Sequence, residues 1–286
     1  MRSITLAKYN LVLRELSRRI PEVRMASMNH YIYQKLINGY AQNHEFLTVK
    51  DFHHHIKAAI VDALDEGLID HDPTKHIKLQ GCSPRVKKTK YLSLLELKRL
   101  LLQLDLSKGL NLDWLILLIS KTGLRYSEAL GITPSDFDFD RQTLTISKTW
   151  NYKTKEGGFL PTKNESSVRT IKIDPITADQ FLDLTKDIPK NKPIFVSEGR
   201  KGLFSSTINS RLKRYCIKAG INTISVHGLR HTHASLLIYD GVSISSVAKR
   251  LGHANTITTQ KTYLHVVKEL EIKDQTKILE NMIRLA

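Results

Sequence analysis

One stretch of this chain alternates in the manner of β-strands, whereas the sequence on both sides of it repeats at helical spacing. Residues Thr143–Tyr152 and Val168–Ile173 alternate, and between them lie a turn at Gly157-Gly158 and a short segment, Phe159–Lys163. Alternation with a period of two is typical of half-buried strands. The sequence therefore predicts a mainly α fold of the α+β class, with one small three-stranded antiparallel sheet inside a helical domain.

A basic segment divides the chain into two regions. Residues 83–90, SPRVKKTK, hold one proline and four basic residues and show no apolar periodicity, as is typical of a linker. A chain of 286 residues is long enough for two hydrophobic cores. We predict one domain over residues 1–84 and a second over residues 85–286.

The first region has a helical pattern throughout. Apolar residues recur at helical spacing at Leu6, Tyr9, Leu13, Leu16 and Ile20, and again at Ile56, Ala59, Ile60, Ala63 and Leu64. The second of these helices is expected to stop at Gly67, and Asp72-Pro73 predicts a turn. These signals predict a small helical bundle.

The second region is expected to begin with two helices. Ser93 and Glu96 have the spacing of a capping box, which predicts a helix start. A very apolar helix is expected from about Asn111 to near Gly123, and the pattern is helical again from Ala178 onward.

The charge of the chain points to an anionic partner. Lys and Arg total 44 against 28 Asp and Glu, which gives a net charge of +16 and an isoelectric point near 9.7. Such an excess can supply phosphate contacts, but a ribosomal protein or a merely basic surface would carry it too. Charge alone therefore only supports nucleic acid as the partner.

Cysteine usage and hydropathy predict a cytoplasmic protein. Cys82 and Cys216 lie far apart with no C-x-x-C partner, so we expect free thiols in a reducing compartment. No apolar run approaches the roughly 20 residues that a membrane span needs. The N-terminal residues lack the apolar core of a signal peptide.

Six residues in five short segments carry side chains that together can cut and rejoin a phosphodiester. They are Arg125 in TGLRYSEAL, Lys163 in PTKNESSVRTIKI, His227 and Arg230 in HGLRHTH, His253 in RLGHA, and Tyr263 in TTQKTYLHV. A motif such as H-x-x-R is weak by itself, because it occurs by chance in many proteins. The ordered set of two arginines, a lysine, two histidines and a tyrosine is the specific signal.

The two arginines suit a phosphate whose non-bridging oxygens gain charge during attack. Guanidinium groups can bind those oxygens in bidentate fashion and stabilise a pentacoordinate state without a metal. Arg125 is expected at a helix start, with Ser127 and Glu128 in the first turn. Arg230 follows His227 by one turn, so both project from the same helix face. Taken singly, each arginine is as well explained by a surface salt bridge.

The tyrosine and the two histidines supply the remaining chemistry. Tyr263 is the candidate nucleophile, in or near a helix that starts at Thr256 or Thr258. A phenol has a pKa of about 10, so nearby cations would have to favour its phenolate. His227 can act as an acid or a base, and His253 can donate a hydrogen bond to a phosphate oxygen. The alternative for Tyr263 is an ordinary core aromatic.

The other histidines are interpreted as structural. His231, His233 and His265 fall in this group. The run His53-His54-His55 resembles a metal site, but consecutive residues on a helix point in different directions and do not converge on one ion. We therefore predict no metal and no cofactor.

The six residues, in this order and in these contexts, resemble the tyrosine recombinases, and among them the integrases of phages and conjugative transposons. The resemblance covers roughly the last two-thirds of the chain. It favours Lys163 over the nearby Lys148, Lys153 and Lys155, because TKNESSVRTI is similar to the family's β-hairpin motif. It implies that Lys163 is a general acid for the departing 5′-oxygen, and that Tyr263 forms a 3′-phosphotyrosine.

The resemblance also implies an assembly. The first region would be a core-binding domain, and the two domains would form a C-shaped clamp on double-stranded DNA attachment sites. A protein that is a monomer in solution would form a homotetramer on DNA and pass through a Holliday junction, integrating or excising a mobile element. An accessory directionality or DNA-bending factor stays open. Many relatives also carry an N-terminal arm-binding module, for which no sequence is seen ahead of the helical pattern that begins almost at Met1.

Two further expectations concern the linker and the C-terminal segment. We expect Arg85, Lys87 and Lys88 to contact backbone phosphates. Residues 268–285 repeat apolar side chains at roughly helical spacing. By resemblance this segment would dock on a neighbouring protomer, and the alternative is that it packs on its own domain.

Three other functions would explain part of the sequence. Residues 244–263 resemble a helix-turn-helix, so a DNA-binding regulator without cleavage activity would explain them and the charge. It would not explain Arg125, Lys163 or the H-x-x-R motif. A type IB topoisomerase and an integrase-derived protein that no longer cleaves are the others. The His253-to-Tyr263 spacing and the intact set of six argue against them.

Overall fold

The structure is a computed structural model that describes residues 3–83, 91–154, 156–196, 203–263 and 283. The chain separates into two compact units, Met1–Lys87 and Lys88–Ala286. The boundary between them falls in the same basic segment as the boundary that we predict. Arg85, Lys87 and Lys88, His265, and the C-terminal segment 268–285 apart from residue 283 lie outside the described residues, so the predictions for them stay predictions.

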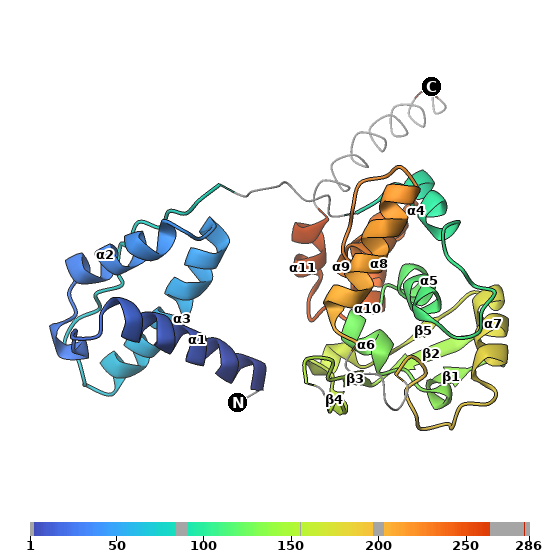
Figure 1. Cartoon of the computed structure of the whole chain (residues 1–286), viewed down its shortest axis with the longest axis horizontal. Helices are drawn as coiled ribbons and strands as arrows, with labels where there is room; N and C mark the ends of the chain where they lie inside the picture. Colours follow the sequence, from blue (N-terminus) through green and yellow to red (C-terminus); the bar gives the residue numbers. More distant parts are fainter. Residues whose placement is uncertain (1–2, 84–90, 155, 197–202, 264–282, 284–286) are drawn as a thin grey trace. The chain divides into compact units, whose positions relative to one another are not determined.

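The N-terminal unit is built from helices, as the apolar spacing predicts. It contains α1 (Ser3–Arg19), a short 3-10 turn (Met25–Ser27), α2 (His30–Ala41) and α3 (Phe46–Asp65) (Figure 1). The Asn29 side chain caps α2 by accepting a hydrogen bond from the Ile32 amide at 2.9 Å. Tyr33, Ile37 and Val49 are fully buried and belong to the core between the helices.

The three consecutive histidines of α3 have separate surroundings. His53 is buried, and its Nδ1 lies 2.9 Å from the Tyr33 hydroxyl. His54 is exposed, and His55 Nδ1 lies 2.7 Å from the Asp51 carbonyl oxygen. Among the described residues there is no group of three or more His, Cys, Asp or Glu that could hold a metal ion.

The second unit is organised around one apolar helix. α4 (Leu94–Leu101) begins with the predicted Ser93–Glu96 capping box. α5 (Leu112–Thr122) is capped by Asn111, and nine of its eleven residues are buried, with Leu115, Ile116, Leu118 and Ile119 fully inaccessible. A helix that is apolar all round belongs in the centre of a domain. α5 packs against α9 (Val226–Tyr239) and α6 (Tyr126–Leu130).

The β segment differs in detail from the predicted sheet. A three-stranded antiparallel sheet is present, in the order β1 (Phe137–Asp138), β2 (Thr143–Ile146) and β5 (Arg169–Lys172). A separate hairpin pairs β3 (Lys148–Trp150) with β4 (Phe159–Pro161).

Two parts of the sheet prediction were therefore wrong. The expected strand 143–152 divides after Ile146, and its two halves pair with different partners, so Phe159–Pro161 is not in the three-stranded sheet. The third strand is β1, which has two residues and is too short to show alternation. Phe137 holds it to the core, because it is buried and stacks on Phe181 with 5.5 Å between ring centroids.

The remaining helices complete the unit. They are α7 (Pro175–Thr185), α8 (Ser205–Lys218), α10 (Ile244–Leu251) and α11 (Thr256–Thr262), with 3-10 turns at Pro134–Asp136 and Glu165–Ser167. α10 contacts β5, α9 and α11. In the part of the chain that is described, no helix combines the length and the apolar character that crossing a membrane requires.

Candidate active site

A glycine turn delivers Arg125 to the site. α5 ends at Gly123, which has a φ of +69°, and a Cβ there would lie 2.7 Å from His233 Cδ2. Glycine is needed because other residues rarely adopt this φ and the space is filled. The turn places Arg125 at the N-cap of α6, as predicted, and its Nη2 donates to the Gly252 carbonyl oxygen at 3.0 Å.

Arg230 projects from α9 into the same place. Its side chain is buried, with 3% of the residue exposed. Nη1 donates to the Gly123 carbonyl oxygen at 2.8 Å, and Nη2 donates to the Leu251 carbonyl oxygen at 2.7 Å. Burial, and then the neighbouring Arg125, lower the pKa of Arg230 to about 9, which still leaves the guanidinium charged at neutral pH.

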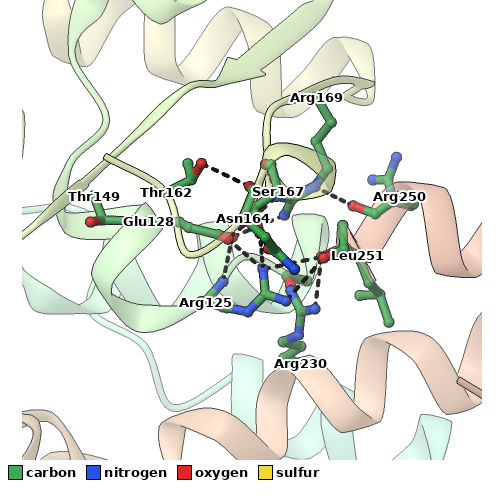
Figure 2. Close-up of polar contacts among 12 residues, drawn as sticks. Arg125, Glu128, Thr149, Thr162, Asn164, Ser167, Arg169, Arg230, Arg250 and Leu251 are labelled. Atoms are coloured by element: carbon green, nitrogen blue, oxygen red, sulfur yellow. Dashed lines mark hydrogen bonds and ion pairs between the residues drawn. The ribbon is translucent and has the colours of Figure 1, made fainter. Parts of the chain in front are cut away.

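Three guanidinium groups donate hydrogen bonds to consecutive carbonyl oxygens at the C-terminal end of α10. Arg169 Nε donates to the Arg250 carbonyl oxygen at 2.6 Å, Arg230 to that of Leu251, and Arg125 to that of Gly252 (Figure 2). Arg125 Nη1 also lies 3.5 Å from the Leu251 oxygen, which the two predicted phosphate ligands therefore share. The last carbonyls of a helix carry partial negative charge, so they suit cations.

Gly252 permits this close approach. It ends α10 with a φ of +66°, and a Cβ there would lie 2.9 Å from Arg169 Nη1 and 3.0 Å from the Ser166 carbonyl oxygen. Only a residue without a side chain allows the loop that precedes β5 to pack against the end of α10.

Glu128 and Arg169 were missed as site residues. Glu128 is buried and bridges two guanidiniums, with Oε1 at 2.6 Å from Arg125 Nη1 and Oε2 at 2.9 Å from Arg169 Nη2. Burial alone would raise the pKa of Glu128, but Arg169 and then Arg125 outweigh it and hold the pKa below its usual value. The carboxylate thus sets the position of Arg125.

The sequence held signals for both residues. Glu128 stands three residues after Arg125, and we placed it only in the first turn of the helix. Arg169 alternates with Ile171 and Ile173, which are buried, so the period of two puts its side chain on the inner face.

Lys163 lies in the loop that connects β4 to β5, and its side chain is exposed. The strand before it is shorter than predicted, because it ends at Pro161. The loop reaches the site through Ser167, whose hydroxyl is buried and lies 3.5 Å from Arg125 Nη1. Ser167 also donates to the Asn164 side chain, which fixes the turn that follows Lys163 (Figure 2).

Tyr263 is at the C-terminal end of α11 and is almost completely buried, with 2% exposed. It packs against Ala234, Ile238, Val247 and Leu251. Burial raises the pKa of Tyr263 to about 12, and Arg230 lowers it by a smaller amount. The expected effect of nearby cations is present, but burial is the larger effect in this structure.

His231 contacts the tyrosine hydroxyl, although we interpreted it as structural. Its Nδ1 lies 3.0 Å from Tyr263 Oη. Its ring also meets the His227 ring edge-on, with centroids 4.6 Å apart. The interpretation of His231 as structural stays a prediction. His233 is buried. Its Nδ1 lies 3.0 Å from the Ser120 carbonyl oxygen and its Nε2 accepts from Arg250 Nε at 2.9 Å, as expected of a structural histidine.

The two predicted histidines lie beside the arginines. Partial removal from water, then Arg230 and Arg125, lower the pKa of His227, although part of this residue is exposed. His253 follows Gly252, and its Nδ1 lies 2.7 Å from the Thr259 hydroxyl. Burial, and then the same arginines, lower the pKa of His253 to about 4, so it is neutral at pH 7.

Five of the six predicted residues lie in two groups of contacts, one around the arginines and one around Tyr263. Arg125 and Arg230 share a carbonyl, His253 follows the carbonyl of Gly252 that binds Arg125, and His227 reaches Tyr263 through His231. Lys163 lies on the loop that supplies Ser167 to the same network. Arg230 is near enough to His227, His253 and Tyr263 to lower the pKa of each of them.

Comparison with known proteins identifies the family of the chain. The model of the phage integrase family matches residues 90–269, which is more than half of the chain and includes all six residues. The chain belongs to the phage integrase family. It is a tyrosine-type recombinase by family, and the alternative of a regulator is not supported.

Relatives and solved structures extend the match beyond the second unit. The XerC-like tyrosine recombinase of Caldanaerobacter subterraneus subsp. tengcongensis is 26% identical over 294 residues, covering 92% of this chain and 72% of that protein. The integrase of a Staphylococcus phage is 30% identical over 171 residues, which cover 55% of this chain and 48% of the phage protein. The chain thus spans about half of that relative.

One solved structure shows the same fold over most of the chain. The integrase of transposon Tn1549, solved in complex with a circular-intermediate DNA, superposes with a TM-score of 0.76. The match covers 92% of this chain and 90% of that chain at 19% identity. The mainly helical fold with small antiparallel sheets is therefore confirmed.

Proposed function

We propose that this chain is a site-specific DNA recombinase of the integrase type, which cuts and rejoins DNA through a 3′-phosphotyrosine on Tyr263. One observation carries the proposal. Arg125 and Arg230, from two different helices, both reach the Leu251 carbonyl oxygen, at 3.5 Å and 2.7 Å. Two guanidiniums that converge on one oxygen are the arrangement that a scissile phosphate needs.

Each of the six residues has a role in this proposal. Arg125 and Arg230 bind the non-bridging oxygens and offset the charge that develops as Tyr263 attacks phosphorus. Lys163, on its exposed loop, protonates the departing 5′-oxygen. His253 is neutral at pH 7 and donates a hydrogen bond to a phosphate oxygen, while His227 acts as acid or base beside it.

Burial of Tyr263 adds a requirement to the proposal. A tyrosine that is only 2% exposed and lies within an apolar cluster cannot bring its hydroxyl to a DNA backbone without movement of the segment that carries it. α11 has only seven residues, and its last turn is followed directly by the tyrosine. We propose that DNA binding shifts this short helix and delivers Tyr263 Oη to the phosphate.

The substrate and the assembly follow the same proposal. The net charge of +16 suits a duplex substrate, and the related transposon integrase was solved with DNA. We propose that four protomers act on two attachment sites and exchange one strand pair at a time through a Holliday junction. The protein would serve a mobile element and act in the cytoplasm of its bacterial host.

A nicked suicide substrate tests the proposal. On a duplex that carries the element's junction sequence, the wild-type chain should form a covalent protein–DNA adduct. Tyr263→Phe should bind the same duplex and form none. The matched control is Tyr239→Phe, an exposed tyrosine at the end of α9, which should form the adduct normally. An adduct with Tyr263→Phe would show that the nucleophile is another residue.

A regulator would behave differently in the same assay. It would form no adduct even as the wild-type chain, and it would change transcription from a nearby promoter with Tyr263→Phe unimpaired.

A further inference from the structure

Asn164 closes the turn that follows Lys163 by accepting hydrogen bonds on both of its oxygens. Its carbonyl oxygen accepts from the Thr162 hydroxyl at 3.1 Å and from the Ser167 amide at 3.0 Å. Its side-chain oxygen accepts from the Ser167 hydroxyl (Figure 2). Asn164 is exposed, whereas Thr162 and Ser167 are buried. Hydrogen bonds from two buried residues, one on each side of Lys163, therefore meet at Asn164.

The same turn is fixed to the end of α10, where the arginines donate their hydrogen bonds. The Ser167 carbonyl oxygen accepts from Arg169 Nη1 at 2.8 Å. Ser167 also packs on Gly252 so closely that a Cβ on the glycine would lie 3.0 Å from Ser167 Cα. The Ser167 hydroxyl lies 3.5 Å from Arg125 Nη1. The turn thus connects the backbone of Lys163 to the place where Arg125 is held.

The order of donors along these contacts fixes the orientation of the Asn164 amide. A guanidinium can only donate, so the Ser167 hydroxyl accepts from Arg125 and gives its one proton to Asn164. The Asn164 side chain therefore presents its oxygen to Ser167. A residue without an acceptor at this position would break the connection between Arg125 and the turn.

A lysine is a difficult general acid to place. Its ammonium is carried by a flexible four-carbon stem, and Lys163 lies on an exposed loop. A general acid must come within hydrogen-bond reach of the departing oxygen, and a displacement of about 1 Å can cost roughly 100-fold in rate. What the fold can set is the backbone position from which the stem extends.

We propose that Asn164 is a positioning residue for the general acid. It holds the backbone of Lys163 in register with the phosphate-binding arginines, so that the ammonium arrives at the 5′-oxygen of the same phosphate. The inference rests on the proposed function, in which Arg125 and Arg230 bind the phosphate and Lys163 gives a proton to the 5′-oxygen as its bond to phosphorus breaks. Asn164 acts only through Lys163.

Single-turnover cleavage of the nicked attachment-site duplex by saturating full-length protein tests this role. Asn164→Ala removes the side-chain acceptor from an exposed residue and should slow cleavage by about 10- to 100-fold, because the general acid is displaced. Thr162→Val keeps the shape of a buried side chain but removes its hydroxyl, and it should also slow cleavage. The matched control is Ser166→Ala, an exposed serine of the same turn, which should cleave at the wild-type rate.

A sulphur substrate shows whether the loss acts through the general acid. When sulphur replaces the bridging 5′-oxygen, the leaving thiolate needs no proton. Asn164→Ala and Lys163→Met should therefore both be slow on the ordinary duplex and recover on the sulphur duplex. On the ordinary duplex, Asn164→Ala should add no further loss to Lys163→Met, since a positioning residue then has no acid to position.

Wild-type cleavage of the ordinary duplex by Asn164→Ala would overturn the proposal. A loss that persists on the sulphur duplex, or that adds to the loss in Lys163→Met, would overturn it as well, because the turn would then act on the arginines or on the fold. Failure of the proposed function looks different. Lys163→Met would then cleave the ordinary duplex at the wild-type rate, or Tyr263→Phe would still form an adduct, and this inference would fall with it.

Discussion

The buried bridge between Arg169 and Glu128 gives the most quantitative prediction. The exposed fractions of the two side chains are 6% and 1%, and Arg169 also donates to the carbonyl oxygens of Ser167 and Arg250, at 2.8 Å and 2.6 Å. Arg169→Met keeps the length of the side chain but removes its charge. Glu128 then keeps only Arg125 as a cationic partner, and the Ser167 and Arg250 carbonyl oxygens lose the hydrogen bonds that Arg169 donates. Breaking a buried ion pair from one side costs about 3–5 kcal/mol.

The assay is thermal unfolding of the full-length protein, followed through the transition of the second unit. The thermal midpoint of a domain of 150–250 residues falls by about 2–4 °C for each kcal/mol of unfolding free energy lost. The midpoint of Arg169→Met should therefore fall by about 6–20 °C. The matched control is Arg141→Met, because Arg141 is paired with Asp138 at 3.8 Å but its side chain is 82% exposed. Exposed pairs contribute less than about 1 kcal/mol. An equal loss of stability in Arg169→Met and Arg141→Met would show that the buried Arg169–Glu128 ion pair does not stabilise the second unit, contrary to this prediction.

Two further predictions concern the surroundings of the arginines. Gly123→Ala should destabilise the second unit by about 1–3 kcal/mol in chemical denaturation, because the φ of +69° is strained for alanine and its Cβ would meet His233 Cδ2 at 2.7 Å; a midpoint equal to that of wild type would contradict this. Burial, and then Arg250, lower the pKa of His233 to about 4, whereas the unfolded chain titrates near 6.5. Its contribution to stability is therefore complete above about pH 6.5 and is lost as the pH falls toward 4, by on the order of 3 kcal/mol. The free energy of unfolding, measured across this pH range, should depend less on pH in His233→Gln than in the wild-type chain. The same pH dependence in both proteins would show that the His233 ring does not cause it.

The order of the elements and most of the candidate site could be predicted from local signals. The capping box at Ser93 and the apolar run that ends at Gly123 fixed two helices, because both signals lie within a few residues of the structure that they specify. The six candidate residues could be proposed for the same reason, since each stands in a short segment with its own context. Their convergence could not be worked out from spacing, because it depends on how α5, α9 and α10 pack together.

The misses have a common physical cause. The contact of His231 with Tyr263 joins α9 to the end of α11, and the spacing within either helix does not encode it. The split of the expected strand after Ile146 depends on which partner each half finds, and β1 pairs over only two residues. Burial of Tyr263 similarly arises from packing against side chains of α9 and α10.

Glu128 is an intermediate case. Its place in the first turn of α6 was evident from the sequence, and its hydrogen bond to the Arg125 amide at 2.9 Å agrees with that place. Its second role, as the carboxylate shared with Arg169, needs a residue from a strand that is distant along the chain.

Mapping the covalent bond tests the central claim most directly. The adduct formed by the wild-type chain on a nicked attachment-site duplex is digested with nuclease and protease, and the modified peptide is sequenced by mass spectrometry. The account predicts a nucleotide remnant on the hydroxyl of Tyr263 and a free 5′-hydroxyl on the released strand. A remnant on any other residue, or a 5′-phosphate on the released strand, would contradict it.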